Sequence, residues 1–455
     1  MKIDNFKNYF FVGIAGSGMS AIAQYLKGIG KNVSGSDREF SHEKQNRNIE
    51  LLAKQGINCF PQNASGIDSQ TEILVISTAI EDDNIEYLKA KELNIPIVLR
   101  SDLLAAITRS KKTVAISGTS GKSTTVAMLF HILQQTNFSP SLITGAGLVS
   151  LQKTGEIGNS YVGNSDWLII EADESDGSLV KYKPEVGVIL NIDKDHKTID
   201  ELLEIFSIFK NNTTQKLIAN NAQERTHSLN PKGDFNFGTN SQSKFCATKF
   251  EQKGFSISFE INGVPFDIPT KGEYNMMNVA AAVSTANYLG ISILDSAIAL
   301  KSYEGIYRRN QLIGEKNGIQ VIDDFAHNPV KIAAAIKANQ PENGRLFACF
   351  QPHGFAPTRF LRAEFVEEII KSLRDEDEII MPEIYYAGGT TTKNISANDL
   401  ICDIKKSGKN AHFFENRLEI IPYLKTNLRA NDIVLITGAR DPNLDEFARK
   451  VFEDI

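Results

Sequence analysis

Cysteine and long apolar runs are scarce in this 455-residue chain, and each shortage narrows the possible classes of protein. No apolar run approaches the length of a membrane span, and the polar N-terminal stretch is not typical of a signal peptide. We therefore expect a cytoplasmic protein without membrane contact and with buried, reduced thiols. The four cysteines lie far apart and form no C-x-x-C pair: Cys59, Cys246, Cys349 and Cys402.

An excess of positive charge is also missing. The formal net charge is -6, whereas a nucleic-acid-binding protein usually shows a basic face, so we expect no nucleic-acid partner. Hydrophobic residues make up 42% and charged residues 23% of the chain, which is ordinary for a soluble globular protein. The length predicts two to four domains.

A phosphate-binding loop is the strongest motif that is present. The apolar run Val114–Ile116 predicts a buried strand, and Gly118-Thr-Ser-Gly-Lys-Ser-Thr124 follows it and leads into a helix. Glycines let backbone N–H groups face a phosphate, Lys122 supplies a positive charge, and the Ser123 hydroxyl is placed for Mg²⁺. Because Ile116 stands where the strict pattern has its first glycine, this loop is a variant. We predict that its seven residues bind the phosphates of a nucleotide: Gly118, Thr119, Ser120, Gly121, Lys122, Ser123 and Thr124.

The N-terminal segment carries a second glycine motif. A strand is predicted from Tyr9, and Gly16-x-Gly18-x-x-Ala21 then fits the dinucleotide fingerprint, with Asp37 placed like a ribose-binding carboxylate. A backbone nest and a helix N-terminus bind any pyrophosphate, so the motif fits a nicotinamide or a nucleotide sugar. Later predicted strands end at Ser77, Thr78 and Arg100. Open α/β sheets bind ligands at such positions, but each residue could equally be an ordinary residue of a surface loop.

The middle segment places acidic residues and a histidine after predicted strands. Glu171 lies where an apolar strand stops, as expected of a carboxylate at a metal–nucleotide site. The dense run Asp173–Asp176 reads mostly as a solvated acidic turn. His196 follows another strand, which favours a ligand role over a structural one. An amphipathic helix is predicted from Ile199 to Lys210, and residues 236–269 predict a small antiparallel sheet.

Two later stretches complete the candidate site. Asn275 and Asn278 open an alanine-rich helix, where their amides either cap the helix or contact adenine. Further on, a strand ends in Asp323-Asp324 before His327, and another runs into His353. The alternation of strands and helices again predicts a doubly wound sheet.

With these motifs, the chain resembles the Mur ligases, the ATP-dependent enzymes of peptidoglycan precursor synthesis, along nearly its whole length. Gly118–Thr124 has a form shared by the Mur ligases and the folylpolyglutamate synthetases. Ser36-Asp37 and the Asp323–His327 string are similar to the branch that joins L-alanine to UDP-N-acetylmuramate. The last string is also similar to the related ligase that attaches a tripeptide during wall recycling. The resemblance implies an α/β fold with three domains. They are a Rossmann-like UDP-sugar domain (1–109), a central phosphate-loop ATP domain with a parallel and a small antiparallel sheet (110–312), and a C-terminal Rossmann-like amine domain (313–455).

The resemblance also implies roles for individual residues, with ATP and Mg²⁺ as cofactors. A carboxylate of UDP-N-acetylmuramate would attack the γ-phosphate of ATP, and an amino acid or short peptide would then displace phosphate from the acyl phosphate. The implied catalytic residues are Lys122, Glu171, His196 and His327. The implied nucleotide contacts outside the loop are Asn275, Asn278, Arg309 and Asp324. The implied UDP-sugar contacts are Gly16, Ser17, Gly18, Met19, Ser36, Asp37, Ser77 and Thr78. The implied metal ligands are Ser123, Glu171, His196 and, if carbamylated, Lys210.

Three departures from the family pattern replace a histidine, at Ser120, Tyr274 and Asn328. Further departures fall on the amine side. His353 and Arg359 are the expected amine-binding residues, but Gly354 and Pro357 stand where the alanine-adding branch has arginines. A missing guanidinium removes a bidentate partner for a carboxylate, which predicts weaker use of L-alanine than of another amine, such as a peptide. Lys210 is either carbamylated and bound to a second Mg²⁺ or a lysine whose ammonium extends to solvent.

Two functions of other classes remain alternatives. An NAD-dependent oxidoreductase is supported only by Gly16–Ala21 and Asp37. A catalytically silent nucleotide-binding protein is disfavoured by four intact site residues: Lys122, Ser123, Glu171 and His196.

Overall fold

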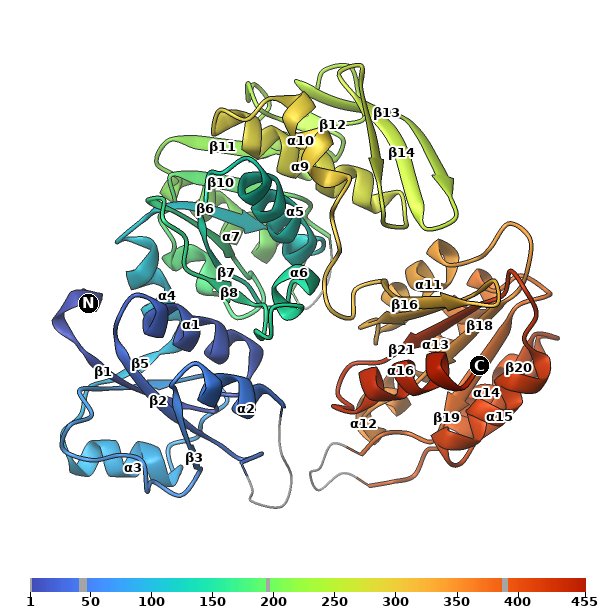
Figure 1. Cartoon of the computed structure of the whole chain (residues 1–455), viewed down its shortest axis with the longest axis horizontal. Coiled ribbons are helices and arrows are strands. Elements are labelled where there is room, and N and C mark those ends of the chain that lie inside the picture. The colour runs from blue at the N-terminus through green and yellow to red at the C-terminus, as the bar shows by residue number, and fades with distance from the viewer. Residues whose placement is uncertain (1, 41–46, 194–196, 387–391) are drawn as a thin grey trace. The chain divides into compact units, whose positions relative to one another are not determined.

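A computed structural model of the chain describes residues 2–40, 47–193, 197–386 and 392–455 (Figure 1). These residues form two compact units. Unit 1 comprises residues 1–251, 257–269 and 273–305, and unit 2 comprises residues 252–256, 270–272 and 306–455. The predicted α/β class is confirmed, because parallel sheets covered by helices occur in both units.

The N-terminal sheet of unit 1 has five parallel strands in the order β3-β2-β1-β4-β5. Its central strands are apolar; all four residues of β4, Ile-Leu-Val-Ile, are buried, as parallel strands between two helix layers require. The strands are β1 (Asn8–Val12), β2 (Asn32–Asp37), β3 (Asn58–Pro61), β4 (Ile73–Ile76) and β5 (Ile97–Leu99). The helices are η1 (Ile3–Asn5), α1 (Ser17–Gly28), α2 (Arg47–Lys54), α3 (Ile85–Glu92) and α4 (Arg100–Thr108).

The second sheet of unit 1 has the order β11-β10-β6-β9-β7-β8, in which only β8 runs antiparallel to its neighbour. The strands are β6 (Lys112–Ser117), β7 (Ser141–Ile143), β8 (Ser160–Tyr161), β9 (Trp167–Glu171), β10 (Val186–Ile189) and β11 (Lys216–Ala219). The helices are α5 (Lys122–Gln135), α6 (Val149–Gln152), η2 (Ser178–Lys181), α7 (Ile199–Asn212) and α8 (Glu224–Leu229). The predicted helix from Ile199 is confirmed as α7, which opens with a capping box at Thr198 and Glu201.

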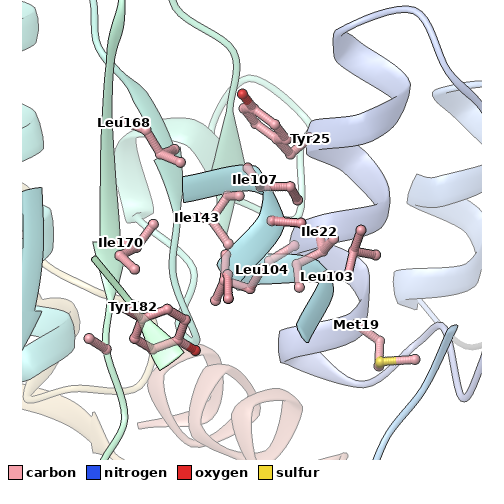
Figure 2. Close-up of a cluster of buried hydrophobic side chains, with 14 of the residues drawn as sticks. Met19, Ile22, Tyr25, Leu103, Leu104, Ile107, Ile143, Leu168, Ile170 and Tyr182 are labelled. Atoms are coloured by element: carbon pink, nitrogen blue, oxygen red, sulfur yellow. The ribbon is translucent and has the colours of Figure 1, made fainter. Parts of the chain in front are cut away.

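One apolar core joins these two sheets. Figure 2 shows Ile22 of α1 and Leu104 of α4 among side chains from the second sheet, including Ile143 of β7 and Ile170 of β9. All four are at most 4% exposed, so the N-terminal helices bury one face against the central sheet. This burial fixes the start of α1 relative to the phosphate-loop domain.

A small sheet and two helices complete unit 1. The sheet has the order β12-β13-β14-β15, with strands β12 (Phe237–Gly238), β13 (Phe245–Lys253), β14 (Ser256–Ile261) and β15 (Val264–Ile268). The predicted antiparallel pairing is confirmed for β14 with β15 and wrong for β12, which pairs parallel with β13. The helices are α9 (Tyr274–Tyr288), which packs on α5, and α10 (Ile293–Leu300).

Unit 2 contains the doubly wound sheet that the last segment predicted. The order is β16-β17-β21-β18-β19-β20, and every pair is parallel except β16 with β17. The strands are β16 (Gln311–Lys316), β17 (Ile319–Asp324), β18 (Leu346–Phe350), β19 (Glu378–Pro382), β20 (Asn410–Phe414) and β21 (Ile433–Thr437). The helices are α11 (Pro329–Ala338), α12 (Phe355–Phe360), α13 (Arg362–Ser372), α14 (Ala397–Lys406), η3 (Arg417–Glu419), α15 (Ile420–Asn427) and α16 (Leu444–Asp454).

The structure corrects one expectation and bears on two others. All four cysteines are free thiols, but only Cys349 is buried and Cys402 is exposed, so the expected burial is wrong for most of them.

Within the described ranges, no helix has both the length and the apolar character needed to cross a bilayer. The predicted boundary at residue 312 falls inside β16, whereas unit 2 resumes at Ile306; the division at 109 and 312 stays a prediction.

Candidate active site

The phosphate loop has the predicted strand–turn–helix geometry. β6 ends at Ser117, Gly118 and Gly121 adopt φ angles of +143° and +83°, and α5 begins at Lys122. Gly121 is left-handed, and a Cβ there would lie 2.4 Å from the Asn278 amide oxygen, so only glycine fits this position without a shift. The N–H groups that begin α5 are therefore free to bind an anion.

Asn191, which follows β10, fixes this loop and was missed by the sequence analysis. Its Oδ1 accepts hydrogen bonds from the Thr119 hydroxyl and the Ser120 N–H, both at 2.8 Å, and its Nδ2 donates to the Ser120 carbonyl at 3.0 Å. The Thr119 hydroxyl in turn accepts from Asp193 N–H at 3.0 Å. The available signal was a polar side chain directly after a buried strand beside the loop.

Lys122 is held by the acidic stretch after β9. Its Nζ lies 2.7 Å from Glu174 Oε2 and 3.4 Å from Asp173 Oδ1, and it donates to the Gly118 carbonyl at 2.8 Å. Burial acts to lower the pKa of Lys122, but the carboxylates of Glu174 and Asp173 outweigh it and leave that pKa above its usual value. The expectation of a solvated acidic turn is wrong for Glu174, which is 4% exposed. A phosphate entering the loop would replace these carboxylates as the partner of Lys122.

Ser123 and Glu171 meet where the metal site was predicted. The Ser123 hydroxyl lies 2.9 and 3.0 Å from the two Glu171 carboxylate oxygens. Glu171 Oε2 also accepts from the Thr144 hydroxyl and the Gly145 N–H, both at 3.0 Å, which orients the carboxylate. A hydroxyl and a carboxylate are the hard oxygen ligands that Mg²⁺ prefers, so the residues fit this ion.

The structure does not place the other two predicted metal ligands, His196 and Lys210, beside Ser123 and Glu171. His196 lies outside the described residues. Lys210 is exposed on the last turn of α7, whose buried side is formed by Leu202, Phe206 and Phe209. Among the described residues, no group of three or more His, Cys, Asp or Glu side chains could hold a metal ion. A metal at Ser123 and Glu171 would therefore take its remaining ligands from phosphate or water, and the role of Lys210 stays a prediction.

Asn275 and Asn278 lie behind the phosphate loop. Both are buried, and Asn278 Nδ2 donates to Asn275 Oδ1 at 2.9 Å while Asn278 Oδ1 faces Gly121 and the Thr125 hydroxyl. Neither side chain caps α9, whose cap residue is Glu273 without a side-chain bond. The capping alternative is thus wrong, and contact with adenine stays a prediction.

The N-terminal glycine loop closes on the end of β2. The N–H groups of Gly13 and Ile14 donate to the Ser36 carbonyl at 2.8 and 2.9 Å, and Ala15 N–H donates to Asp37 Oδ2 at 2.9 Å. Through this hydrogen bond Asp37 stabilises the glycine loop, in addition to any contact with a ligand. Gly16 precedes α1, whose first turn contains Ser17, Gly18 and Met19 and presents helix N–H groups that lack intrahelical partners.

Two further residues support this loop. The Ser36 hydroxyl donates to Glu86 Oε2 at 2.6 Å, and burial raises the pKa of Glu86, which is fully buried. Arg100 lies against Gly18 and pairs with Asp176 at 2.8 Å, so it brings a guanidinium to the start of α1. Glu86 was missed because only the fold brings it behind β2. Ser77 and Thr78 follow β4, and Thr78 is exposed.

In unit 2, the predicted nucleotide residues are Asp324, which ends β17, and Arg309, which precedes β16. Asp324 accepts from the Asn310 and Ala326 N–H groups at 2.6 and 2.7 Å, while Arg309 lies over the Phe325 ring at 5.2 Å. The adjacent Asp323 is fully buried and pairs with Arg308 at 3.0 Å. Arg308 also donates to the Gly438 carbonyl at 2.8 Å, so it ties the ends of β17 and β21 together.

His327, predicted to be catalytic, and His353, predicted to bind the amine, follow strands at the same edge of this sheet. The His327 and His353 rings are 5.8 Å apart, and burial lowers the pKa of both, that of His353 to about 4. Asn328 caps α11 by accepting from Lys331 N–H at 2.9 Å, which gives this departure from the family pattern a structural reason. Arg359 is exposed on α12 and bonds to Asn394.

The fold and these contacts define a class. A glycine loop between a parallel strand and a helix, with a lysine at its end and a hydroxyl–carboxylate pair beside it, is the arrangement typical of a nucleoside triphosphate site. A second glycine loop in the same unit and a doubly wound sheet in unit 2 add two further places for ligands. The chain is therefore an α/β protein of the phosphate-loop nucleotide-binding class.

Comparison with known proteins identifies the family within that class. Residues 8–112 match the Mur ligase family catalytic domain, residues 116–286 the Mur ligase middle domain, and residues 308–440 the Mur ligase glutamate ligase domain. The chain belongs to the Mur ligase family, as the sequence motifs predicted, and it has the three-domain architecture of that family.

Named relatives cover nearly the whole chain. It is 33% identical to the UDP-N-acetylmuramate–L-alanine ligase of Pelotomaculum thermopropionicum over 96% of both chains. It is also 33% identical to the enzyme of the same name from Geotalea daltonii over 94% of both. The crystal structure of the UDP-N-acetylmuramate–alanine ligase of Thermotoga maritima matches with a TM-score of 0.81 at 26% identity over 98% of both chains. A murein peptide ligase from Psychrobacter arcticus shares the fold, with a TM-score of 0.67 at 20% identity.

Proposed function

We propose that this chain is an ATP-dependent, ADP-forming ligase that joins an amino acid, L-alanine or a similar one, to UDP-N-acetylmuramate in peptidoglycan precursor synthesis. The observation that carries the proposal is the Lys122–Ser123–Glu171 arrangement in a chain that is similar to ligases of this name over 96% of its length. The NAD-dependent alternative is disfavoured, because the relatives compared above are ligases.

The residues of unit 1 suit the first step of such a reaction. A substrate carboxylate would attack the γ-phosphate of ATP, breaking its bond to the bridging oxygen and releasing ADP, to give an acyl phosphate. Phosphoryl transfer depends on positioning and charge neutralisation, which Lys122 and the N–H groups at the start of α5 provide. Mg²⁺, held by Ser123 and Glu171, would add positive charge at the phosphate oxygens.

The second step needs an uncharged amine. Its nitrogen would attack the acyl carbon, and the tetrahedral intermediate would expel phosphate and leave an amide. The two imidazoles of unit 2 are the residues best suited to this substrate, because their lowered pKa values keep them uncharged near neutral pH. The start of α1, with Arg100 beside it, suits the pyrophosphate of the nucleotide sugar.

Phosphate release tests this function directly. The enzyme would be given UDP-N-acetylmuramate and Mg·ATP with a panel of amino acids and peptides, and mass spectrometry would identify the product. We expect release that depends on both the sugar nucleotide and the amine. No amine-dependent release would refute the proposal and favour a catalytically silent nucleotide-binding protein.

A second candidate is ligation of a tripeptide, as in wall recycling. It is favoured by Gly354 and Pro357, which leave the loop after β18 without the arginines of the alanine-adding branch. The same screen separates the two candidates, since the tripeptide would then give the higher kcat/KM and L-alanine only weak release.

A further inference from the structure

Three neighbouring strands of unit 2 end in register, and His327, Arg440 and His353 follow their ends. Thr437 of β21 pairs with Asp324 of β17 on one side and with Phe350 of β18 on the other. His327, Arg440 and His353 each lie three residues after one of these paired positions. Arg440 therefore follows the middle strand, and the two histidines follow the strands on either side of it. β21 and β18 are also adjacent strands whose connections lead to opposite sides of the sheet, and ligands of α/β proteins bind at such a switch point.

The two imidazoles bring hydrogen-bonding atoms but no charge to this edge. His327 Nδ1 lies 2.8 Å from the Phe325 carbonyl oxygen, which can only accept, so Nδ1 carries the proton and Nε2 of the neutral ring has the lone pair. His353 Nδ1 is buried and has no hydrogen-bond partner among the described residues. Burial and the nearby positive charge of Arg440 lower the pKa of both rings. Lys331 and Arg309 also lower the pKa of His327, but of these cations only Arg440 acts on both rings.

The carboxylates near Arg440 are bound to other groups. The adjacent Asp441 pairs with Arg417 and accepts from Asn443 N–H at 2.9 Å. Asp323 pairs with Arg308, and Asp324 accepts two backbone N–H groups. Arg440 itself is exposed and forms no ion pair within the part of the chain that the structure describes. A guanidinium in this position can bind a carboxylate through two parallel hydrogen bonds.

The loop after β18 does not supply a competing guanidinium. Gly354, directly after His353, has a φ of +72°, which disfavours any side chain there, and Arg359 is bonded to Asn394. We propose that Arg440, between His327 and His353, binds the α-carboxylate of the acceptor and so selects a free amino acid. The inference rests on the proposed function and names its amine substrate class. This selection is the opposite of the peptide preference that Gly354 and Pro357 suggested. In a peptide, the α-carboxyl group next to the free amine forms an amide bond, so it offers no carboxylate to Arg440.

Acceptors with and without that carboxylate test the proposal. We would compare kcat/KM for L-alanine and L-alaninamide, with UDP-N-acetylmuramate and Mg·ATP, in the wild type and in Arg440→Ala and Arg440→Lys. Losing hydrogen bonds to a charged group should raise the KM for L-alanine about tenfold to a hundredfold in Arg440→Ala, with intermediate values for lysine. The wild-type preference for L-alanine over its amide should fall by a similar factor, while the KM values for ATP and UDP-N-acetylmuramate stay unchanged.

Arg449→Ala is the matched control, because Arg449 is another exposed arginine of unit 2, on α16, and should change none of these constants. An unchanged preference in Arg440→Ala would overturn the assignment. So would a rise in the KM for ATP alone, which would place Arg440 on the nucleotide. A wild type that uses L-alaninamide or an L-alanyl peptide as well as L-alanine would also overturn it and leave the ligase function intact. Absence of release with every amine would instead refute the proposed function.

Discussion

At the residue scale, Lys122 shows how buried carboxylates stabilise the charge of a phosphate-loop lysine. A lysine in a loop between a strand and a helix would be expected to be exposed, and its removal would be expected to leave the fold intact. The side chain is in fact 13% exposed and is paired with Glu174, whose side chain is 5% exposed. Removing the lysine therefore leaves a buried carboxylate without its partner, so activity and stability change together.

We expect Lys122→Ala to lower ligation by at least about a hundredfold, because a preorganised donor to the phosphates is lost. It should also lower the free energy of unfolding by about 1–3 kcal/mol, since Glu174 loses its partner. Phosphate release and urea unfolding measure the two effects. The double variant Lys122→Ala, Glu174→Gln should regain stability but not activity. Turnover like that of the wild type in Lys122→Ala would rule out the assigned ATP site.

His353 gives a pH prediction whose sign follows from its lowered pKa, about 4 against an ordinary 6.5. Above about pH 6.5 the ring is neutral in both the folded and the unfolded chain, so it adds no pH dependence. As the pH falls from there towards 4, the unfolded chain binds a proton that the folded chain does not, and stability is lost. His353→Gln should therefore lose less stability than the wild type in this window, as measured by urea unfolding. Parallel curves for both proteins would contradict this explanation.

At the element scale, α7 decides between the two interpretations of Lys210. The apolar side of the helix is buried, but Lys210 is exposed on its last turn, where a cation also interacts favourably with the helix dipole. This placement favours a lysine whose ammonium extends to solvent over a carbamylated metal ligand.

We accordingly expect Lys210→Ala to ligate at close to the wild-type rate, with no response to added acetate. The measurement is phosphate release over a range of Mg²⁺ and acetate concentrations. A loss of activity that acetate partly restores would show instead that a carbamate at Lys210 takes part in catalysis.

At the scale of the whole molecule, the N-terminal glycine loop belongs to a ligase and not to a dehydrogenase. The two functions share the backbone nest, and Asp37 is bonded to Ala15 N–H in this structure. We predict that the chain binds the uridine nucleotide sugar and not a nicotinamide. Calorimetric titration with UDP-N-acetylmuramate and with NAD separates them, and binding of NAD without binding of the sugar nucleotide would overturn the prediction.

Much of this molecule could be predicted from local sequence. Short apolar runs that end in glycine or in acidic residues predicted the strands and the phosphate loop, because backbone conformation and burial of a parallel strand depend on neighbouring residues. The same patterns placed Ser123, Glu171, His327 and His353 at strand or helix ends. The family followed from these motifs because they lie in one order along the chain.

What only the tertiary structure decided is which side chains meet. Asn191 locks the phosphate loop from another strand, Glu174 is buried against Lys122, and Glu86 supports Ser36 from a separate helix. Arg440 follows a strand that lies between the two strands preceding the histidines, because β21, the last strand in sequence, inserts between β17 and β18. Strand order and register depend on packing between distant segments, which local sequence patterns do not encode. The sequence by itself thus determined the elements and the phosphate chemistry, and the fold determined the partners of each charge.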